Sequence, residues 1–292
     1  MSRISRAFLR KAKIAYLTAG HASCNSGNKS AVESVSARSN DKIATLLCNS
    51  HINENPVVTR QAAIDQSVEY FLALTRAGVN ILEIGLPFSD PVADGPVIQL
   101  AMEQALNDGI NFAATLEIIE KVRSKTDAAI IVFTYLNPLL HNLEAALTKL
   151  KQAGSDGILV VDLPLEENDK LRFLCDKLDL APIMVAAPST TLSRVQLLSE
   201  AGGGFLYYAC RKGTTGVRDE LPKDIINQIK QVKKSSKLPV AVGFGVSSAA
   251  MVNKLLDVAD GCVIGSYFVN AITDGKTPNE LEIMAKQVFS NV

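Results

Sequence analysis

The chain lacks an excess of charge of either sign and any long hydrophobic run. Its 30 Lys and Arg side chains are matched by 30 Asp and Glu, so no positive field attracts nucleic acid or an anionic membrane. Charged residues are only 21% and hydrophobic residues 47% of the 292-residue chain, which excludes a disordered, solvated chain. Apolar runs such as residues 128–133 have about a third of the length that a membrane-spanning helix needs. We therefore expect a soluble globular protein.

Cysteine and histidine are scarce and scattered, and tryptophan is absent. The cysteines are odd in number and never form a Cys-x-x-Cys pair, so the sequence predicts neither disulfides nor a zinc site and favours a reducing, cytoplasmic compartment. The histidines have no thiols or carboxylates at ligand spacing, so we expect ordinary surface residues and no metal. These residues are Cys24, Cys48, Cys175, Cys210 and Cys262, and His21, His51 and His141.

Two segments differ from the rest of the chain. Residues 3–12 are basic and amphipathic, which is also the composition of an organelle transit peptide. They lead directly into the β-like run 13–18, so we interpret them as a short helix that covers the fold. Residues 21–60 are rich in Ser and Asn and have little apolar periodicity, which is typical of a long, disordered or weakly helical loop. The sequence indicates no role for this segment.

Eight short runs, apolar on both faces, alternate with amphipathic stretches of helical length. This pattern is typical of parallel strands covered by helices on both sides, because only crossover helices link parallel neighbours. Without residues 21–60 the chain has the length of one (β/α)₈ TIM barrel, about 250 residues. We therefore predict a single α/β TIM-barrel domain over residues 1–292, with residues 21–60 inserted in the first strand-to-helix loop. The predicted strands are 13–18, 80–85, 128–134, 156–161, 182–186, 204–209, 239–243 and 260–264.

One carboxylate is predicted to point into the barrel. In the second strand, alternation directs Leu82 and Ile84 toward the helices and Glu83 toward the interior. A buried carboxylate is costly unless something compensates it. A structural ion pair with a lysine of another strand is one explanation, but no Lys or Arg stands in the middle of a predicted strand. We favour a general acid/base with a raised pKa.

The loop after this strand, residues 86–96, carries two more carboxylates, Asp90 and Asp94. Residue type and position alone leave two interpretations open. The two aspartates are either site residues at the carboxyl end of the barrel or ordinary turn and helix-cap residues.

Glycine-containing turns follow the late strands, at residues 213–216, 243–245 and 265–266. The loops after strands seven and eight, with the amino end of a short helix, form the usual phosphate site of TIM barrels. The alternative for Gly265-Ser266 is an ordinary strand exit in which Ser caps a helix. The polar segment 210–222 is predicted to be either a mobile lid or a plain surface loop.

The run Leu82-Glu83-Ile84-Gly85-Leu86-Pro87-Phe88-Ser89-Asp90-Pro91-Val92-Ala93-Asp94-Gly95 resembles the signature of the tryptophan synthase alpha chain family. Six further motifs are similar to motifs of that family, in the same order, and the resemblance extends over the whole chain except the insertion. They are Tyr16-Leu17-Thr18-Ala19-Gly20, Tyr135-Leu136-Asn137-Pro138, Asp162-Leu163-Pro164, Arg211-Lys212-Gly213-Thr214-Thr215-Gly216, Gly243-Phe244-Gly245-Val246-Ser247 and Gly265-Ser266.

The resemblance implies a reaction and a role for each site residue. The reaction is the retro-aldol cleavage of indole-3-glycerol phosphate to indole and D-glyceraldehyde 3-phosphate, with Glu83 as acid/base and Asp94 accepting a hydrogen bond from the indole N–H. Residues implied to bind the phosphate are Gly216, Gly245, Gly265 and Ser266. Residues implied to line the indole end are Phe133, Leu159, Val185, Tyr207 and Phe244, and Thr215 in the lid is implied to meet Asp94 on closure.

The resemblance also implies a partner. The family works with a pyridoxal-phosphate-dependent beta chain in an alpha2beta2 tetramer, whereas the alpha chain itself holds no cofactor. The loops around Asp90 and around Asn137 and Pro138 are implied to face that chain. The sequence departs from the family pattern at His21-Ala22, where Asp-Pro is usual, which puts the first loop and the partner interface in doubt; it also departs at Cys210 and Val161, where Ser and Pro are common.

Two other functions fit parts of the sequence. A catalytically weak subunit that only binds and activates a beta chain is the first, but retention of both Glu83 and Asp94 counts against it. Indoleglycerol phosphate synthase, another phosphate-binding barrel, is the second. That enzyme needs an inward-pointing lysine on a strand, which the predicted strands lack.

Overall fold

The computed structural model describes residues 1–22, 59–210, 224–243, 245 and 248–290. Within these residues, parallel strands form one sheet in the order β5-β4-β3-β2-β1-β9-β8-β7-β6. The strands are β1 (Ala12–Thr18), β2 (Ile81–Gly85), β3 (Ala129–Thr134), β4 (Gly157–Val160), β5 (Ala181–Pro182), β6 (Met184–Ala186), β7 (Leu206–Ala209), β8 (Val240–Gly243) and β9 (Gly261–Ile264).

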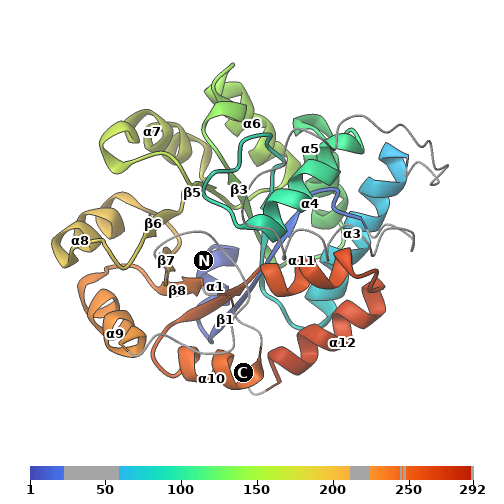
Figure 1. The fold of residues 1–292 in the computed structure, drawn as a ribbon. Helices are drawn as coiled ribbons and strands as arrows, with labels where there is room; N and C mark the ends of the chain where they lie inside the picture. Colours follow the sequence, from blue (N-terminus) through green and yellow to red (C-terminus); the bar gives the residue numbers. More distant parts are fainter. Residues whose placement is uncertain (23–58, 211–223, 244, 246–247, 291–292) are drawn as a thin grey trace, which may run out of the picture.

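Helices surround the strands, so the architecture is the predicted TIM barrel (Figure 1). The α-helices of the described residues are α1 (Arg3–Ala7), α3 (Arg60–Arg76), α4 (Pro96–Asn107), α5 (Phe112–Arg123), α6 (Leu143–Ala153), α7 (Asp169–Leu178), α8 (Leu192–Ala201), α9 (Ile225–Ser235), α10 (Ala249–Leu256), α11 (Ser266–Thr273) and α12 (Pro278–Val288). Two 3₁₀ turns, η1 (Asn137–Leu139) and η2 (Leu165–Glu167), lie in the loops after β3 and β4. None of these helices combines the length and apolar character needed to cross a bilayer.

Local sequence signals set the beginnings of several helices. The Thr59 hydroxyl accepts a hydrogen bond from the Ala62 N–H at the start of α3, and Thr277 and Glu280 form a capping box at the start of α12. Such caps satisfy backbone N–H groups that have no partner within a helix. Because β1 ends at Thr18 and α3 begins at Arg60, the predicted insertion lies in the first strand-to-helix connection; most of it, residues 23–58, is outside the described residues.

The fifth predicted strand, residues 182–186, is observed as two short strands. Pro182 ends β5 and has no N–H to donate to a neighbouring strand, and β6 begins at Met184. β5 pairs with β4, and β6 pairs with β7 on the other side. Between them the Ile183 N–H still donates to the Ile158 carbonyl at 2.8 Å. The chain thus changes neighbours at this point and closes the ring.

The buried side chains form two clusters that correspond to the two faces of the strands. The larger cluster lies between strands and helices and includes Leu82 and Ile84. The smaller one fills the barrel interior and includes Ile81. This division confirms the predicted alternation in the second strand, and it places Glu83 on the inner face with Ile81.

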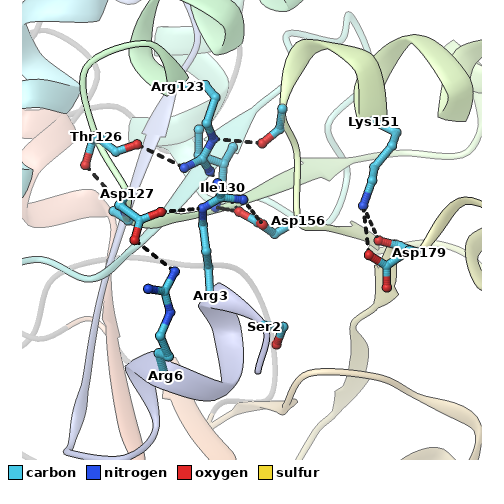
Figure 2. A network of polar contacts seen from close by, with 12 residues as sticks. Ser2, Arg3, Arg6, Arg123, Thr126, Asp127, Ile130, Lys151, Asp156 and Asp179 are labelled. Carbon is cyan, nitrogen blue, oxygen red and sulfur yellow. Dashed lines mark hydrogen bonds and ion pairs between the residues drawn. The ribbon is translucent and has the colours of Figure 1, made fainter.

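Helix α1 covers the amino ends of the strands. In Figure 1 it lies over the middle of the ring, and Ile4 and Ala7 are part of the interior cluster. Figure 2 shows its polar contacts: Arg3 binds Asp127 at 2.7 Å and Asp156 at 3.1 Å. The predicted covering helix is therefore confirmed.

This helix is shorter than the predicted range 3–12. It ends at Ala7, with Phe8 as its C-cap, because the chain must then turn into the barrel strand β1, which begins at Ala12. Phe8 packs on Phe205 at a ring-centroid distance of 5.4 Å, which fixes the turn. Leu9, on the outside of the turn, is exposed.

Candidate active site

Glu83 lies in the middle of β2 and points into the barrel. Its register partners are Tyr16 on β1 and Ile131 on β3. The side chain is 1% exposed, and its Oε1 atom is buried with no hydrogen-bond partner. No cation among the described residues pairs with it, so the structural ion-pair interpretation is wrong for this part of the chain. Burial raises the pKa of Glu83 to about 8, because a low-dielectric environment disfavours the charged form.

Asp94 lies in the loop after β2, at the same end of the barrel, and is 4% exposed. It does not cap helix α4, since the N-cap is Gly95 and no side chain caps that position. Instead its Oδ2 accepts a hydrogen bond of 2.7 Å from the Tyr135 hydroxyl. Burial raises the pKa of Asp94 to about 6, and the hydrogen bond from Tyr135 opposes that rise. The cap interpretation is therefore wrong for Asp94.

Asp90 differs from Asp94 in both exposure and partners. It is exposed, and its Oδ2 accepts a hydrogen bond of 2.5 Å from the neighbouring Ser89 hydroxyl. This local contact is typical of a turn residue. Asp90 therefore belongs to the outer surface of the loop, away from the buried carboxyls.

Two glycines make room for tyrosine side chains at the carboxyl end of the barrel. The hydroxyl of Tyr16 lies where a Cβ atom on Gly85 would project, and the hydroxyl of Tyr207 lies where one on Gly243 would project. Burial raises the pKa of both phenols well above the ordinary value, and the carboxyls of Glu83 and Asp94 contribute further. Both tyrosines therefore lie close enough to Glu83 and Asp94 for the carboxyl charges to act on them.

Four of the residues expected at the indole end belong to the barrel interior. Leu159 belongs to the interior cluster, and Phe133, Val185 and Tyr207 pack against it. The Phe133 and Tyr16 rings meet edge to face with centroids 5.4 Å apart. These interior side chains are therefore apolar and aromatic, a character that suits a flat hydrophobic ring. Phe244 and Thr215, also expected here, lie outside the described residues.

The glycines expected to bind phosphate lie on neighbouring loops. β8 and β9 pair side by side with Gly243 opposite Val263, so Gly245 and Gly265 each follow by two residues at the same edge. Gly265 is the N-cap of α11, and Ser266 is its first residue and is 7% exposed. Ser266 is thus not the cap, contrary to the alternative interpretation. The N–H groups at the start of a helix favour an anion. Gly216, the fourth residue expected to bind phosphate, lies outside the described residues.

Sequence reasoning missed two tyrosines and misjudged one histidine. Tyr16 and Tyr135 belong to the family-like motifs but have no predicted role. A polar aromatic residue in or just after a strand that neighbours β2 is the signal that could have identified them. His21 is 1% exposed rather than a surface residue, and its Nε2 lies 3.2 Å from the Thr273 hydroxyl. Burial lowers the pKa of His21 to about 4. His141 is exposed, as expected.

Cysteines and possible metal ligands do not cluster within the described ranges. No group of three or more His, Cys, Asp or Glu side chains there has the arrangement of a metal site. Cys175, Cys210 and Cys262 are free, buried thiols, and burial raises the pKa of the Cys262 thiol to about 12. These thiols are packing residues, with no reactive thiolate near neutral pH.

Comparisons with known proteins point to one family. The family model for the tryptophan synthase alpha chain matches residues 55–291. The tryptophan synthase alpha chain of Coxiella burnetii (strain RSA 493 / Nine Mile phase I) is 46% identical over 225 residues, which are 77% of this chain and 84% of that protein. The tryptophan synthase alpha chain of Chlamydia felis is 40% identical over 228 residues, or 77% of this chain and 89% of that protein.

Solved structures agree with these sequence relatives. A Mycobacterium tuberculosis tryptophan synthase chain superposes with a TM-score of 0.77 at 29% identity, covering 98% of this chain and 96% of that one. A mutant tryptophan synthase alpha-subunit from Pyrococcus furiosus gives a TM-score of 0.74 at 28% identity, with 96% of each chain covered. The fold similarity therefore extends beyond the region matched by the family model.

Proposed function

Because the chain belongs to the tryptophan synthase alpha chain family, we propose that Glu83 and Asp94 are the residues with which it cleaves its substrate. The chain is a lyase of tryptophan biosynthesis that converts indole-3-glycerol phosphate to indole and D-glyceraldehyde 3-phosphate. The observation that carries the proposal is the buried, unpaired Glu83 carboxyl facing the barrel interior.

Glu83 acts first as an acid and then as a base. With a pKa of about 8, it is mostly protonated at neutral pH and transfers its proton to C3 of the indole ring. The resulting carboxylate then takes the proton of the substrate hydroxyl next to the bond that breaks. The O–H electron pair forms the aldehyde C=O, and the pair of the broken carbon–carbon bond returns to the ring. Glu83 ends the cycle protonated, so one group performs both transfers.

Asp94 stabilises the charge that this step creates. Protonation at C3 makes the ring nitrogen positive, and the indole N–H then donates to the Asp94 carboxylate. With a pKa of about 6, Asp94 is ionised at neutral pH while Glu83 is not. Different environments thus give the two carboxyls opposite charge states and opposite tasks.

The remaining pocket residues hold the two ends of the substrate. Phe133, Leu159, Val185, Tyr207 and Phe244 contact the indole ring, and Thr215 meets Asp94 when the lid closes. The backbone at Gly216, Gly245, Gly265 and Ser266 binds the phosphate. The amino end of α11, next to Gly265, supports this assignment, because its dipole favours an anion.

The partner of the chain is a tryptophan synthase beta chain, which uses the indole. We propose an alpha2beta2 tetramer in the cytoplasm, in which pyridoxal phosphate serves the beta chain and the alpha chain needs no cofactor. Two loops at the carboxyl end support this face as the interface, because Val92 and Leu140 expose large apolar side chains there. Asp90, Asn137 and Pro138 lie on the same two loops.

The domain organisation follows from the same observations. We propose one TIM-barrel domain over residues 1–292, in which residues 21–60 are an insertion. The position of this segment between β1 and α3 supports the proposal, since strand-to-helix loops of barrels tolerate variation.

A steady-state assay tests the function. The purified chain is incubated with indole-3-glycerol phosphate, alone and with a beta chain, and indole release is measured. We expect cleavage in both conditions and faster cleavage in the complex. If no indole is released in either condition while tryptophan formation from added indole still increases, the chain is only an activating subunit.

A further inference from the structure

The hydroxyl of Tyr135 connects the loop after β2 with the loop after β3. It donates a hydrogen bond of 2.7 Å to Asp94 Oδ2 and accepts one of 3.0 Å from the Ala93 N–H. Tyr135 is 1% exposed and its ring packs on Phe88 with centroids 5.2 Å apart. One buried oxygen therefore holds both a carboxylate and the backbone beside it.

The chemistry of this contact assigns the proton to Tyr135. Burial and the neighbouring Asp94 carboxylate raise the pKa of the phenol far above its ordinary value, so the phenol stays protonated and donates. Within the described ranges, Asp94 forms no ion pair, and Tyr135 is the side chain that donates to its carboxylate, at Oδ2 and not at Oδ1. Tyr135 is therefore the side chain that compensates the buried charge of Asp94.

We propose that Tyr135 is a positioning residue for Asp94: its hydroxyl holds Oδ2 and the adjacent backbone, and leaves Oδ1 to accept the indole N–H of the substrate. This inference rests on the proposed function of Asp94. Tyr135 acts through Asp94 and takes no part in proton transfer to the substrate. Tyr135 thus orients Asp94, one of the two carboxyls proposed to act on the substrate.

The test compares Tyr135→Phe with the wild-type chain, each in complex with a beta chain. The variant keeps the ring contact with Phe88 and removes only the hydroxyl. Without the donor, the charged form of Asp94 is less stable, so its pKa rises. We expect the acid limb of the pH profile to move upward by about one pH unit. At pH 7 kcat/KM should fall by about tenfold, about twofold from the lower ionised fraction of Asp94 and the rest from the loss of its orientation. Tyr208→Phe is the matched control, because its hydroxyl faces Gln228 on the helix side at 3.3 Å; its profile should not move.

Two further measurements separate positioning from a structural effect. In an Asp94→Asn background, Tyr135→Phe should cause little additional loss, because both changes remove the same interaction. Replacement of Tyr135 by 3-fluorotyrosine keeps the hydroxyl and makes it a stronger donor, so the acid limb should move to lower pH; this substitution tests the inference even if the Phe variant fails to fold.

The possible results are distinguishable. An unmoved acid limb in folded Tyr135→Phe overturns the positioning role. So does a double variant, Tyr135→Phe with Asp94→Asn, whose loss in kcat/KM equals the product of the two single losses. Absence of cleavage by the wild-type complex instead overturns the proposed function itself.

Discussion

The two ends of the barrel surround their carboxyls in different ways. At the amino end, Asp156 is held by Arg3, by Arg123 at 2.8 Å and by the Ile130 N–H at 2.9 Å (Figure 2). At the carboxyl end, Glu83 has a buried oxygen without a partner. Asp156 lies just before β4 and is partly exposed, whereas Glu83 lies within β2 and is 1% exposed, so the two carboxyls differ in both burial and neighbours.

This difference indicates a division of tasks along the barrel axis. A carboxylate bonded to cations and N–H groups of several elements ties those elements together, which is a structural role. A buried carboxyl without such partners costs stability and keeps its proton near neutral pH, a state that suits catalysis. The unfavourable environment of Glu83 is thus the source of its proposed activity.

The largest expected effect is at Glu83. Glu83→Gln retains the size of the side chain but removes the titrating proton, so indole release should fall by roughly a thousandfold or more. Glu69→Gln, on the outer helix α3, is the control and should retain full activity. Indole release by the complexes measures both, and turnover of Glu83→Gln within a few-fold of wild type contradicts the assignment.

A smaller effect, on stability and not on activity, is expected at the amino end. Asp156→Ala removes the carboxylate that Arg3, Arg123 and the Ile130 N–H share, while Arg123 keeps its bonds to the carbonyls of Gly154 and Thr126. The free energy of unfolding should therefore fall by about 2 kcal/mol. Urea unfolding measures the loss, and indole release at low temperature should be unchanged. Glu144→Ala, in helix α6, is the control, because its exposed side chain pairs with the exposed Lys177 at 2.7 Å and such pairs contribute little. Equal losses in the two variants contradict the division of tasks.

The pH dependence of kcat/KM is expected to show the smallest effect. Activity needs ionised Asp94 and protonated Glu83, whose pKa values are about 6 and about 8. The profile should therefore be bell-shaped, with a plateau between these values and a fall of about tenfold for each pH unit beyond either limb. Activity that rises continuously to pH 10 is incompatible with Glu83 as the initial acid.

Stability should follow pH in the direction opposite to an ordinary carboxylate. Because the folded pKa of Glu83 is raised, its contribution is fully present below the unfolded value of about 4.3 and is lost as pH rises toward about 8. Replacement by Gln should thus stabilise the chain at alkaline pH. Glu83→Gln should thus remove activity and, at alkaline pH, also remove the free-energy cost of burying the Glu83 carboxylate.

Several features could be predicted from the sequence because they depend on short-range periodicity. Alternation in β2 was enough to direct Glu83 inward, and glycines at strand ends indicated the loops around Gly245 and Gly265. The division of the fifth strand was not predicted, because it depends on a change of neighbour at Ile183 that no local pattern records.

The partners of polar side chains could not be predicted. Tyr135 and Asp94 are separated by 41 positions in the chain, and only the closed barrel brings their loops together. His21 was expected at the surface because its residue type is usually exposed, whereas packing near α11 buries it. Tertiary contacts decide both cases.

Direct titration of the Glu83 side chain in the folded protein tests the central claim. Infrared difference spectra between wild type and Glu83→Gln, recorded from pH 4 to pH 10, isolate the C=O band of the protonated carboxyl. We expect that band to persist at pH 7 and to disappear around pH 8. Loss of the band near pH 4 would show that Glu83 is an ordinary carboxylate, and the account of the active site would then be wrong.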